Sequence, residues 1–171
     1  MSIWSSTEAE NTLGYLKAAV FGFQGSGKTF AAVKQAIGLH KHLTSIGQKP
    51  GPVGIFDTER GADFAVPEFK RHGVPLFVIR GRAFAKLIEA IDEAASSNFS
   101  ILIVDSATHV WRDLCDSYQK SKGANGRSYR LQFQDWAFLK SEWAQFTDRL
   151  VNAKLHMLVL GRAGHEYANV E

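Results

Sequence analysis

Short apolar runs recur along the chain and are separated by longer stretches of mixed character. The runs cover residues 16–21, 53–56, 76–79, 101–104 and 155–160. An unbroken apolar run of roughly four to eight residues is consistent with a buried strand. The run 101–104 ends in an aspartate and is typical of a parallel strand buried on both faces. The pattern therefore predicts a series of five strands.

Two of the intervening stretches carry apolar residues at spacings of three and four, which is typical of amphipathic helices. A third predicted helix, residues 29–43, follows the first strand. Strands that alternate with helices predict an α/β fold, a mainly parallel β-sheet with helices on both faces, in which ligands bind at the carboxyl ends of the strands. The two periodic sets are Phe84, Leu87, Ile88, Ile91 and Ala95, and Trp136, Leu139, Trp143, Phe146 and Leu150.

The length of 171 residues suits one domain, which we expect to span residues 1–171 with residues 1–14 as an N-terminal arm or short helix. A hydrophobic content of 45% is sufficient for a sizeable core. The formal charge of +3 is too small to indicate a polyanionic partner by itself. The sequence carries no internal repeat and no linker that would divide it.

Cysteine content and hydropathy bear on cellular location. The single cysteine, Cys115, excludes an intramolecular disulfide and a cysteine-based metal site, which favours a reducing compartment. Residues 1–11 lack the basic and apolar regions of a leader, and no apolar stretch reaches about 18 residues. We therefore expect a cytoplasmic protein that does not associate with a membrane.

Residues 22–29 read Gly-Phe-Gln-Gly-Ser-Gly-Lys-Thr and match the phosphate-loop pattern G-x-x-x-x-G-K-[ST]. A glycine-rich turn between a strand and a helix directs backbone N–H groups into one concavity, where phosphate oxygens are stabilised. The loop therefore predicts binding of a nucleoside triphosphate, with Lys28 on the β- and γ-phosphates and the Thr29 hydroxyl on Mg²⁺. The predicted contacts to ATP in this segment are Gly22, Gln24, Gly25, Ser26, Gly27, Lys28, Thr29 and Phe30.

Two acidic positions follow strands and complete the predicted site. Asp105 ends the run 101–104, where a carboxylate can hold the magnesium together with Thr29. Hydrolysis also needs a group that orients water toward the γ-phosphate, and Glu59, just beyond the run 53–56, is the candidate. Two alternatives stay open: Asp57 competes for the catalytic role, and Glu59 could instead cap a helix or pair with Arg60.

The order of the phosphate loop, residues 56–62 and residues 101–106 resembles the ATPase core of the RecA recombinases, in which an acidic D-x-E sequence after a strand supplies the catalytic glutamate. The likeness covers most of residues 16–162. In size the chain is similar to small phage-encoded RecA-like proteins, nucleotide-binding AAA-type ATPases of which some anneal single strands. The resemblance implies a RecA-like P-loop fold and assigns the catalytic role to Glu59.

The resemblance also implies a DNA-binding loop over residues 117–131. This stretch has four basic residues, two tyrosines, two glycines and no acidic residue up to position 130. Such a composition suits single-stranded nucleic acid, because phosphates bind the cations and bases stack on aromatic rings. A solvated loop without a ligand is the alternative. The implied DNA contacts are Lys120, Lys122, Arg127, Tyr129 and Arg130.

Two features depart from the RecA pattern. Relatives carry a polar sensor of the γ-phosphate at the end of the last strand, and this chain has Arg162 there, which could contact phosphate or pair with an acidic residue. The chain also ends at Glu171, where relatives continue into a second DNA loop, so it is a fragment or a reduced version. The resemblance further implies association of subunits, with Arg149 and Arg162 as candidates for a residue acting on a neighbour's ATP.

Taken together, the sequence predicts a Mg²⁺-dependent ATPase that acts on single-stranded DNA in phage recombination or replication. One alternative is a small-molecule or nucleotide kinase, in which Arg60, Arg80 and Arg82 would grip an acceptor. The other is an assembly factor gated by nucleotide binding alone. Glu59 argues against this second alternative, because a protein that only binds nucleotide needs no carboxylate to orient water.

Overall fold

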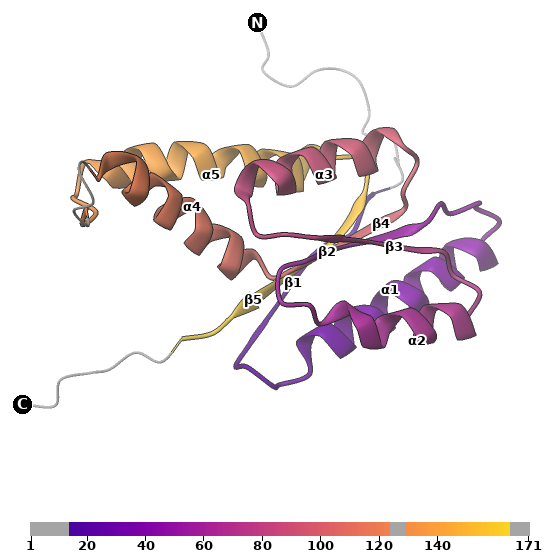
Figure 1. Ribbon diagram of the computed structural model, residues 1–171. Coiled ribbons are helices and arrows are strands. Elements are labelled where there is room, and N and C mark those ends of the chain that lie inside the picture. Colours follow the sequence, from indigo (N-terminus) through magenta and orange to yellow (C-terminus); the bar gives the residue numbers. More distant parts are fainter. Residues whose placement is uncertain (1–13, 124–128, 165–171) are drawn as a thin grey trace, which may run out of the picture.

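The computed structural model describes residues 14–123 and 129–164 (Figure 1). Five strands of these residues form one sheet in the order β1-β5-β4-β2-β3, and every neighbouring pair is parallel. The predicted parallel sheet is therefore confirmed, with each strand within one or two residues of its expected bounds. The strands are β1 Lys17–Gly22, β2 Val53–Asp57, β3 Leu76–Arg80, β4 Ile101–Asp105 and β5 His156–Arg162.

Helices cover both faces of the sheet, as the alternating pattern predicts (Figure 1). On one face lie α1 (Lys28–Ser45) and α2 (Ala65–Arg71), the latter preceded by a short 3₁₀ turn, η1 (Ala62–Phe64). On the other lie α3 (Phe84–Ser96), α4 (Ala107–Lys122) and α5 (Asp135–Asn152). Figure 1 shows that α4 and α5 run together beyond the edge of the sheet, so that their joined end lies far from its centre.

The central strands are buried on both faces because successive side chains alternate between two apolar layers. In β4, Ile101 and Ile103 pack toward α1 and α2, whereas Leu102 and Val104 pack toward α3, α4 and α5. Each such buried side chain contributes about 1.5–3 kcal/mol relative to exposure. The apolar layers therefore fix the register of β4, and with it the position of Asp105 at the strand's end.

The periodicity did not predict α4, although the chain carries a signal for it. Val110, Leu114 and Tyr118 follow one another at a spacing of four and face α3 and α5. The prediction of a loop over residues 117–131 is wrong for its first part, because residues 117–122 complete α4. Lys120 and Lys122 therefore lie in the last turn of a helix, where cations are favoured by the helix dipole.

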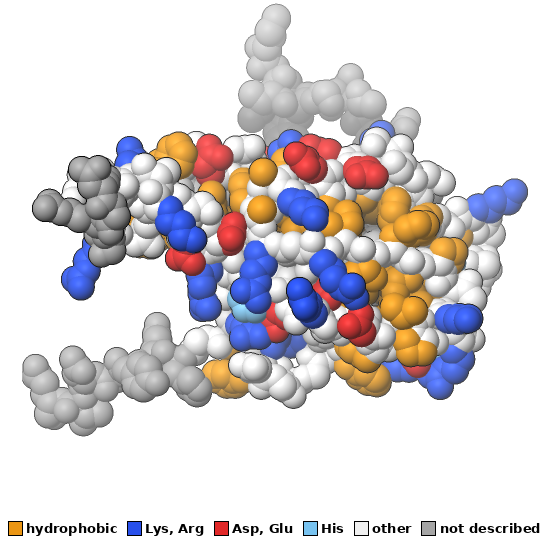
Figure 2. Space-filling model, viewed as in Figure 1, with side chains coloured by type: hydrophobic (Ala, Val, Ile, Leu, Met, Phe, Trp, Pro, Cys, Tyr) orange, Lys and Arg blue, Asp and Glu red, His pale blue; other side chains and the backbone are white. Residues whose placement is uncertain are grey.

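Parallel pairing aligns the functional residues at one edge of the sheet. Gly22 of β1 pairs with Arg162 of β5, and Asp57 of β2 pairs with both Asp105 of β4 and Arg80 of β3. Lys and Arg side chains gather near this edge on the face shown in Figure 2.

Residues 1–13, most of the predicted arm, lie outside the described part of the chain. No helix of the described part is long and apolar enough to cross a membrane.

Candidate active site

The loop between β1 and α1 has the backbone shape that a phosphate cradle requires. Gly25 (φ 77°) and Gly27 (φ 82°) adopt left-handed conformations, which side chains with a Cβ rarely accept. A Cβ on Gly22 would lie 2.7 Å from the hydroxyl of Ser26, so a larger residue there would require the Ser26 side chain to shift. Among the described residues no side chain caps the first turn of α1, which leaves its N–H groups available to an anion.

This loop forms one wall of an open cavity of about 390 Å³. The volume lies in the range of small-molecule sites. All residues that line this cavity, except Phe64, were predicted from the sequence to bind nucleotide or to act in catalysis. Of the residues predicted for these roles, only Gly22 and Ser26 do not line the cavity. The lining residues are Gln24, Gly25, Gly27, Lys28, Thr29, Phe30, Glu59, Phe64, Asp105 and Arg162.

Lys28 lies across the mouth of the loop. Its Nζ donates to the carbonyl oxygens of Gly22 (2.9 Å) and Phe23 (2.7 Å). These two contacts hold the ammonium group against the backbone of the loop, at the edge of the cavity that Lys28 lines. An anion that entered the cradle would therefore meet a cation already held beside the backbone donors.

Thr29 and Asp105 form the oxygen-rich side of the cavity. The Thr29 hydroxyl donates to Asp105 Oδ2 at 2.6 Å. Burial raises the pKa of Asp105; the charges of Glu59 and Asp57 add to this, whereas the Thr29 hydrogen bond and Lys28 oppose it. A cation at this position would relieve the cost of holding the carboxylate ionised.

This donor set fits Mg²⁺. Within the described ranges, no three His, Cys, Asp or Glu side chains are grouped to hold a metal by themselves. Mg²⁺ is commonly bound by only one or two protein oxygens, with phosphate and water completing its shell. Thr29 and Asp105 supply that number of oxygens beside the phosphate cradle.

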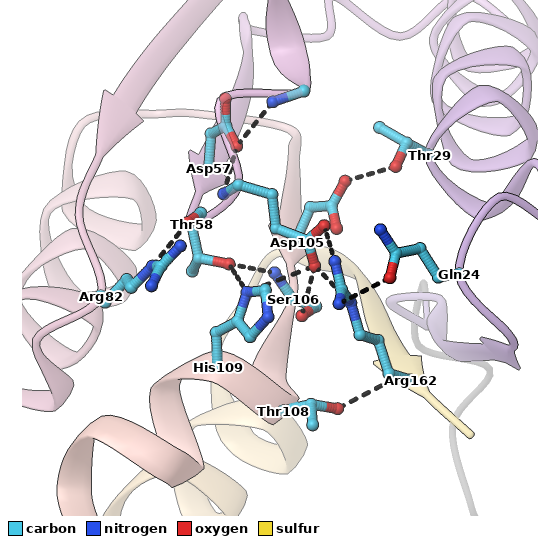
Figure 3. A network of polar contacts seen from close by, with 12 residues as sticks. Gln24, Thr29, Asp57, Thr58, Arg82, Asp105, Ser106, Thr108, His109 and Arg162 are labelled. Atoms are coloured by element: carbon cyan, nitrogen blue, oxygen red, sulfur yellow. Dashed lines mark hydrogen bonds and ion pairs between the residues drawn. The ribbon is translucent and has the colours of Figure 1, made fainter. Parts of the chain in front are cut away.

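Glu59 is held by an ion pair with Arg162 (Figure 3). Arg162 Nε donates to Oε1 at 2.8 Å, and Nη2 donates to Oε2. Burial raises the pKa of Glu59, but the Arg162 hydrogen bond and charge, with His109 and Ser106, outweigh it and the net shift is downward. Glu59 is therefore ionised at neutral pH. Arg162 was expected to contact phosphate or to pair with an acidic residue, and in the structure it pairs with Glu59. Glu59 therefore pairs with Arg162 and not with Arg60.

Behind this pair lies a polar network that sequence reasoning did not find. Ser106 Oγ donates to Glu59 Oε1 at 3.2 Å, and His109 Nδ1 lies 3.2 Å from the same oxygen. His109 Nδ1 is also 2.9 Å from Thr58 Oγ1, which accepts the Ser106 N–H at 2.9 Å. Figure 3 shows these residues around the end of β4 and the start of α4. The network adds to the hold of Arg162 on the carboxylate, because Ser106, His109 and Arg162 Nε all contact Oε1.

Asp57, the competing candidate, is committed to the backbone. Its side chain is buried and accepts three N–H groups, from Glu59 (2.9 Å), Gly61 (3.2 Å) and Ala62 (3.0 Å). These bonds form the turn that carries Glu59 out of β2. Asp57 therefore positions the turn, and the geometry favours Glu59 as the reactive carboxylate.

Phe64 is the second feature that the sequence did not reveal. It lies on η1 and stacks with Phe30 of α1, with ring centroids 6.5 Å apart and an interplanar angle of 28°. Both rings are about half exposed and line the cavity. Exposed aromatic faces at the edge of a nucleotide-sized cavity offer a stacking surface for a flat ring.

The implied DNA-binding residues that the structure describes do not line this cavity. Lys120 and Lys122 end α4, which starts beside Glu59 and is about 24 Å long at 1.5 Å per residue. Arg127 lies outside the described residues. The hydroxyls of Tyr118 and Tyr129 both donate to Asp135 at 2.9 Å, and this hydrogen bond raises the pKa of both phenols. The Tyr129 side chain is therefore held at the start of α5 by its hydrogen bond to Asp135.

A parallel sheet with a glycine-rich phosphate loop after its first strand, and with acidic groups at the ends of neighbouring strands, defines a P-loop nucleotide-binding domain. A family model described as an AAA domain matches residues 15–171, and the chain belongs to this family. It is thus an AAA-type domain of the P-loop ATPase class. No match was found among the curated proteins.

The role of Asp57 gives a testable prediction. Replacing it with Ala leaves three backbone donors without their acceptor, and an unsatisfied buried group costs about 1–3 kcal/mol. We expect Asp57→Ala to lower the free energy of unfolding by at least about 2 kcal/mol, measured by urea denaturation. Asp116→Ala, an exposed aspartate of α4, is the control and should change it by less than about 0.5 kcal/mol. An Asp57→Ala protein of normal stability would contradict this role.

Proposed function

We propose that this protein is a Mg²⁺-dependent, RecA-like ATPase that hydrolyses ATP while acting on single-stranded DNA. The observation that carries the hydrolytic part is the position of Glu59. An ionised carboxylate, held by Arg162, lines the same cavity as the phosphate-loop lysine and Asp105. Phosphoryl transfer to water requires this combination of phosphate clamp, metal ligand and water-orienting acceptor.

The chain's own residues divide the work of hydrolysis. The loop N–H groups and Lys28 would hold the phosphates, while Thr29 and Asp105 would hold Mg²⁺, which would supply positive charge to the phosphates. Glu59 accepts a hydrogen bond from the attacking water and aligns it with the γ-phosphate. Because its pKa is low, Glu59 acts mainly by orienting the water and by stabilising charge late in the reaction.

Arg162 has a place in this mechanism because it can reach two partners. Its Nη1 lies 3.5 Å from the Gln24 side-chain oxygen in the phosphate loop, while its other nitrogens hold Glu59. A γ-phosphate carries more negative charge than a carboxylate and competes for the guanidinium. Movement of Arg162 toward the phosphate would free Glu59 oxygens for water only when ATP is present.

The adenine ring is assigned to the Phe30–Phe64 surface. Both rings lie at the rim of the cavity that contains the loop. Stacking of a base on an aromatic face contributes about 1–3 kcal/mol and does not depend on salt. This contact favours a nucleotide over a bare polyphosphate.

Single-stranded DNA is assigned to the joined end of α4 and α5. Lys120 and Lys122 provide two cations in the last turn of α4, and Lys122 Nζ lies 5.4 Å from the ring centroid of Tyr118. Arg130 follows Tyr129, whose carbonyl oxygen accepts a hydrogen bond from Gln119 of the same helix. The RecA resemblance supports this assignment, a role in phage recombination or replication, and association of identical subunits. Since α4 begins at the Glu59 network and ends at these cations, one rigid helix joins the two sites.

The metal assignment is tested by nucleotide binding. Asp105→Asn should weaken binding of a fluorescent ATP analogue about 10- to 100-fold with Mg²⁺ present, the scale of one charged contact, and much less with EDTA. Lys28→Ala is the matched comparison and should weaken binding under both conditions, because it acts on phosphate directly. If Asp105→Asn gave equal losses with and without Mg²⁺, Asp105 would serve the fold and not the metal.

The DNA assignment is tested by the dependence of affinity on salt. Each cation removed from a phosphate contact should flatten the slope of log affinity against log salt by about 0.7. We therefore expect Lys120→Ala, Lys122→Ala and Arg130→Ala together to weaken binding of a thymidine oligonucleotide and flatten the slope by about two units. The control combines Lys49→Ala, Lys70→Ala and Lys154→Ala, three exposed lysines elsewhere. Equal slopes in the two triple variants would exclude this surface.

A further inference from the structure

A second cavity of about 380 Å³ opens beside the first, at the carboxyl ends of β2 and β3. Glu59 lines both cavities and is the only residue that they share. The second cavity therefore lies across Glu59 from the phosphate loop. Its lining residues are Asp57, Thr58, Glu59, Arg60, Arg80, Gly81 and Arg82.

Three of these residues are arginines, and their charge is poorly compensated. Within residues 14–123 and 129–164, Arg80 forms an ion pair with exposed Asp63, but no carboxylate pairs with Arg60 or Arg82. The two acidic residues of the lining are already engaged, Asp57 by backbone N–H groups and Glu59 by Arg162. The cavity consequently carries excess positive charge although carboxylates lie in its wall.

The backbone positions two of these arginines in different ways, through the guanidinium of Arg82 and through the main-chain turn that carries Arg60. Arg82 Nε donates to the carbonyl oxygen of Thr58 at 2.9 Å, which leaves its terminal nitrogens without a partner in the described part of the chain. Arg60 lies in the turn held by Asp57, with a left-handed φ of 60°. Figure 3 shows Arg82 on the side of Thr58 away from Arg162, so the two guanidinium groups flank the Glu59 network.

We propose that this second cavity binds the phosphate group of a ligand other than the hydrolysed nucleotide, as a phosphomonoester or a phosphodiester. Guanidinium groups match phosphate oxygens in geometry and charge, and the Arg82 guanidinium, already held by Thr58, loses less entropy on binding than a free side chain would. The volume is sufficient for a phosphorylated sugar or one unit of a nucleic acid strand. The site uses none of the phosphate-loop residues and shares only Glu59 with the cavity of the proposed ATPase, so phosphate binding there does not require ATP hydrolysis.

The test is a site-resolved titration followed by NMR of arginine side-chain Nε–H signals in the full chain. The probes are glycerol 3-phosphate, a free phosphomonoester, and a short thymidine oligonucleotide, a phosphodiester. Both titrations use the Lys28→Ala protein, so that binding at the phosphate loop does not contribute. We expect saturable shifts of the Arg60 and Arg82 signals with at least one probe, and no shift of Arg71, an exposed arginine of α2.

Variants decide whether the cavity is the site. Arg60→Gln and Arg82→Gln should each weaken the affinity of the effective probe by about tenfold or more, the usual loss for one charge-assisted contact. Arg71→Gln should leave it unchanged, and Arg82→Lys, which keeps the charge, should recover part of the loss. Thermal unfolding establishes that each variant is folded.

The two probes also identify the source of the phosphate. Shifts with glycerol 3-phosphate alone support a free phosphorylated ligand, and shifts with the oligonucleotide support a nucleic acid backbone. The proposal is overturned if neither probe shifts Arg60 and Arg82 at millimolar concentration, or if the Gln variants bind as tightly as Arg71→Gln. Neither result would decide the ATPase proposal, because Arg60 and Arg82 have no assigned part in hydrolysis.

Discussion

Parallel pairing in one register is the constraint on which the rest of this molecule depends. It sets the phosphate loop after β1, Arg162 at the end of β5, Asp105 at the end of β4 and Asp57 at the end of β2 along a single edge. A slip of one residue in any strand would turn these side chains to the opposite face. The register is held by apolar layers on both sides of β2 and β4, so the core and the site are specified together.

The same alignment brings three carboxylates to one edge, and the protein compensates each of them differently. Asp57 accepts three backbone N–H groups and organises a turn. Glu59 is paired with Arg162 and stays ionised. Asp105 accepts one hydrogen bond from the Thr29 hydroxyl, and burial still raises the pKa of Asp105. The structural role of Asp57 and the proposed water-orienting and metal-binding roles of Glu59 and Asp105 thus follow from their partners, since the three side chains have nearly the same chemistry.

The sequence was sufficient to predict the strands and the phosphate loop, because each depends on a local pattern. The strands follow from apolar runs, and the loop follows from glycines at fixed spacing. It could not identify Phe64, His109 or the partner of Glu59, because these depend on which segments the fold brings together. The helix α4 was missed for another reason. Its polar last turn, with Lys120 and Lys122, has the composition of a loop, and packing of Tyr118 against Phe138 of α5 outweighs that local preference.

The central claim is that Glu59 orients water for attack on ATP, and release of free phosphate by Glu59→Gln tests it most directly. The Glu59→Gln protein should bind ATP with an affinity within a few-fold of that of the wild-type protein. Its turnover should be lower by about 10²-fold or more, because the carboxylate is needed chiefly in the transition state. Glu89→Gln, an exposed glutamate of α3, is the matched control and should hydrolyse ATP normally. A Glu59→Gln protein that binds ATP and releases phosphate at the unchanged rate would contradict the account.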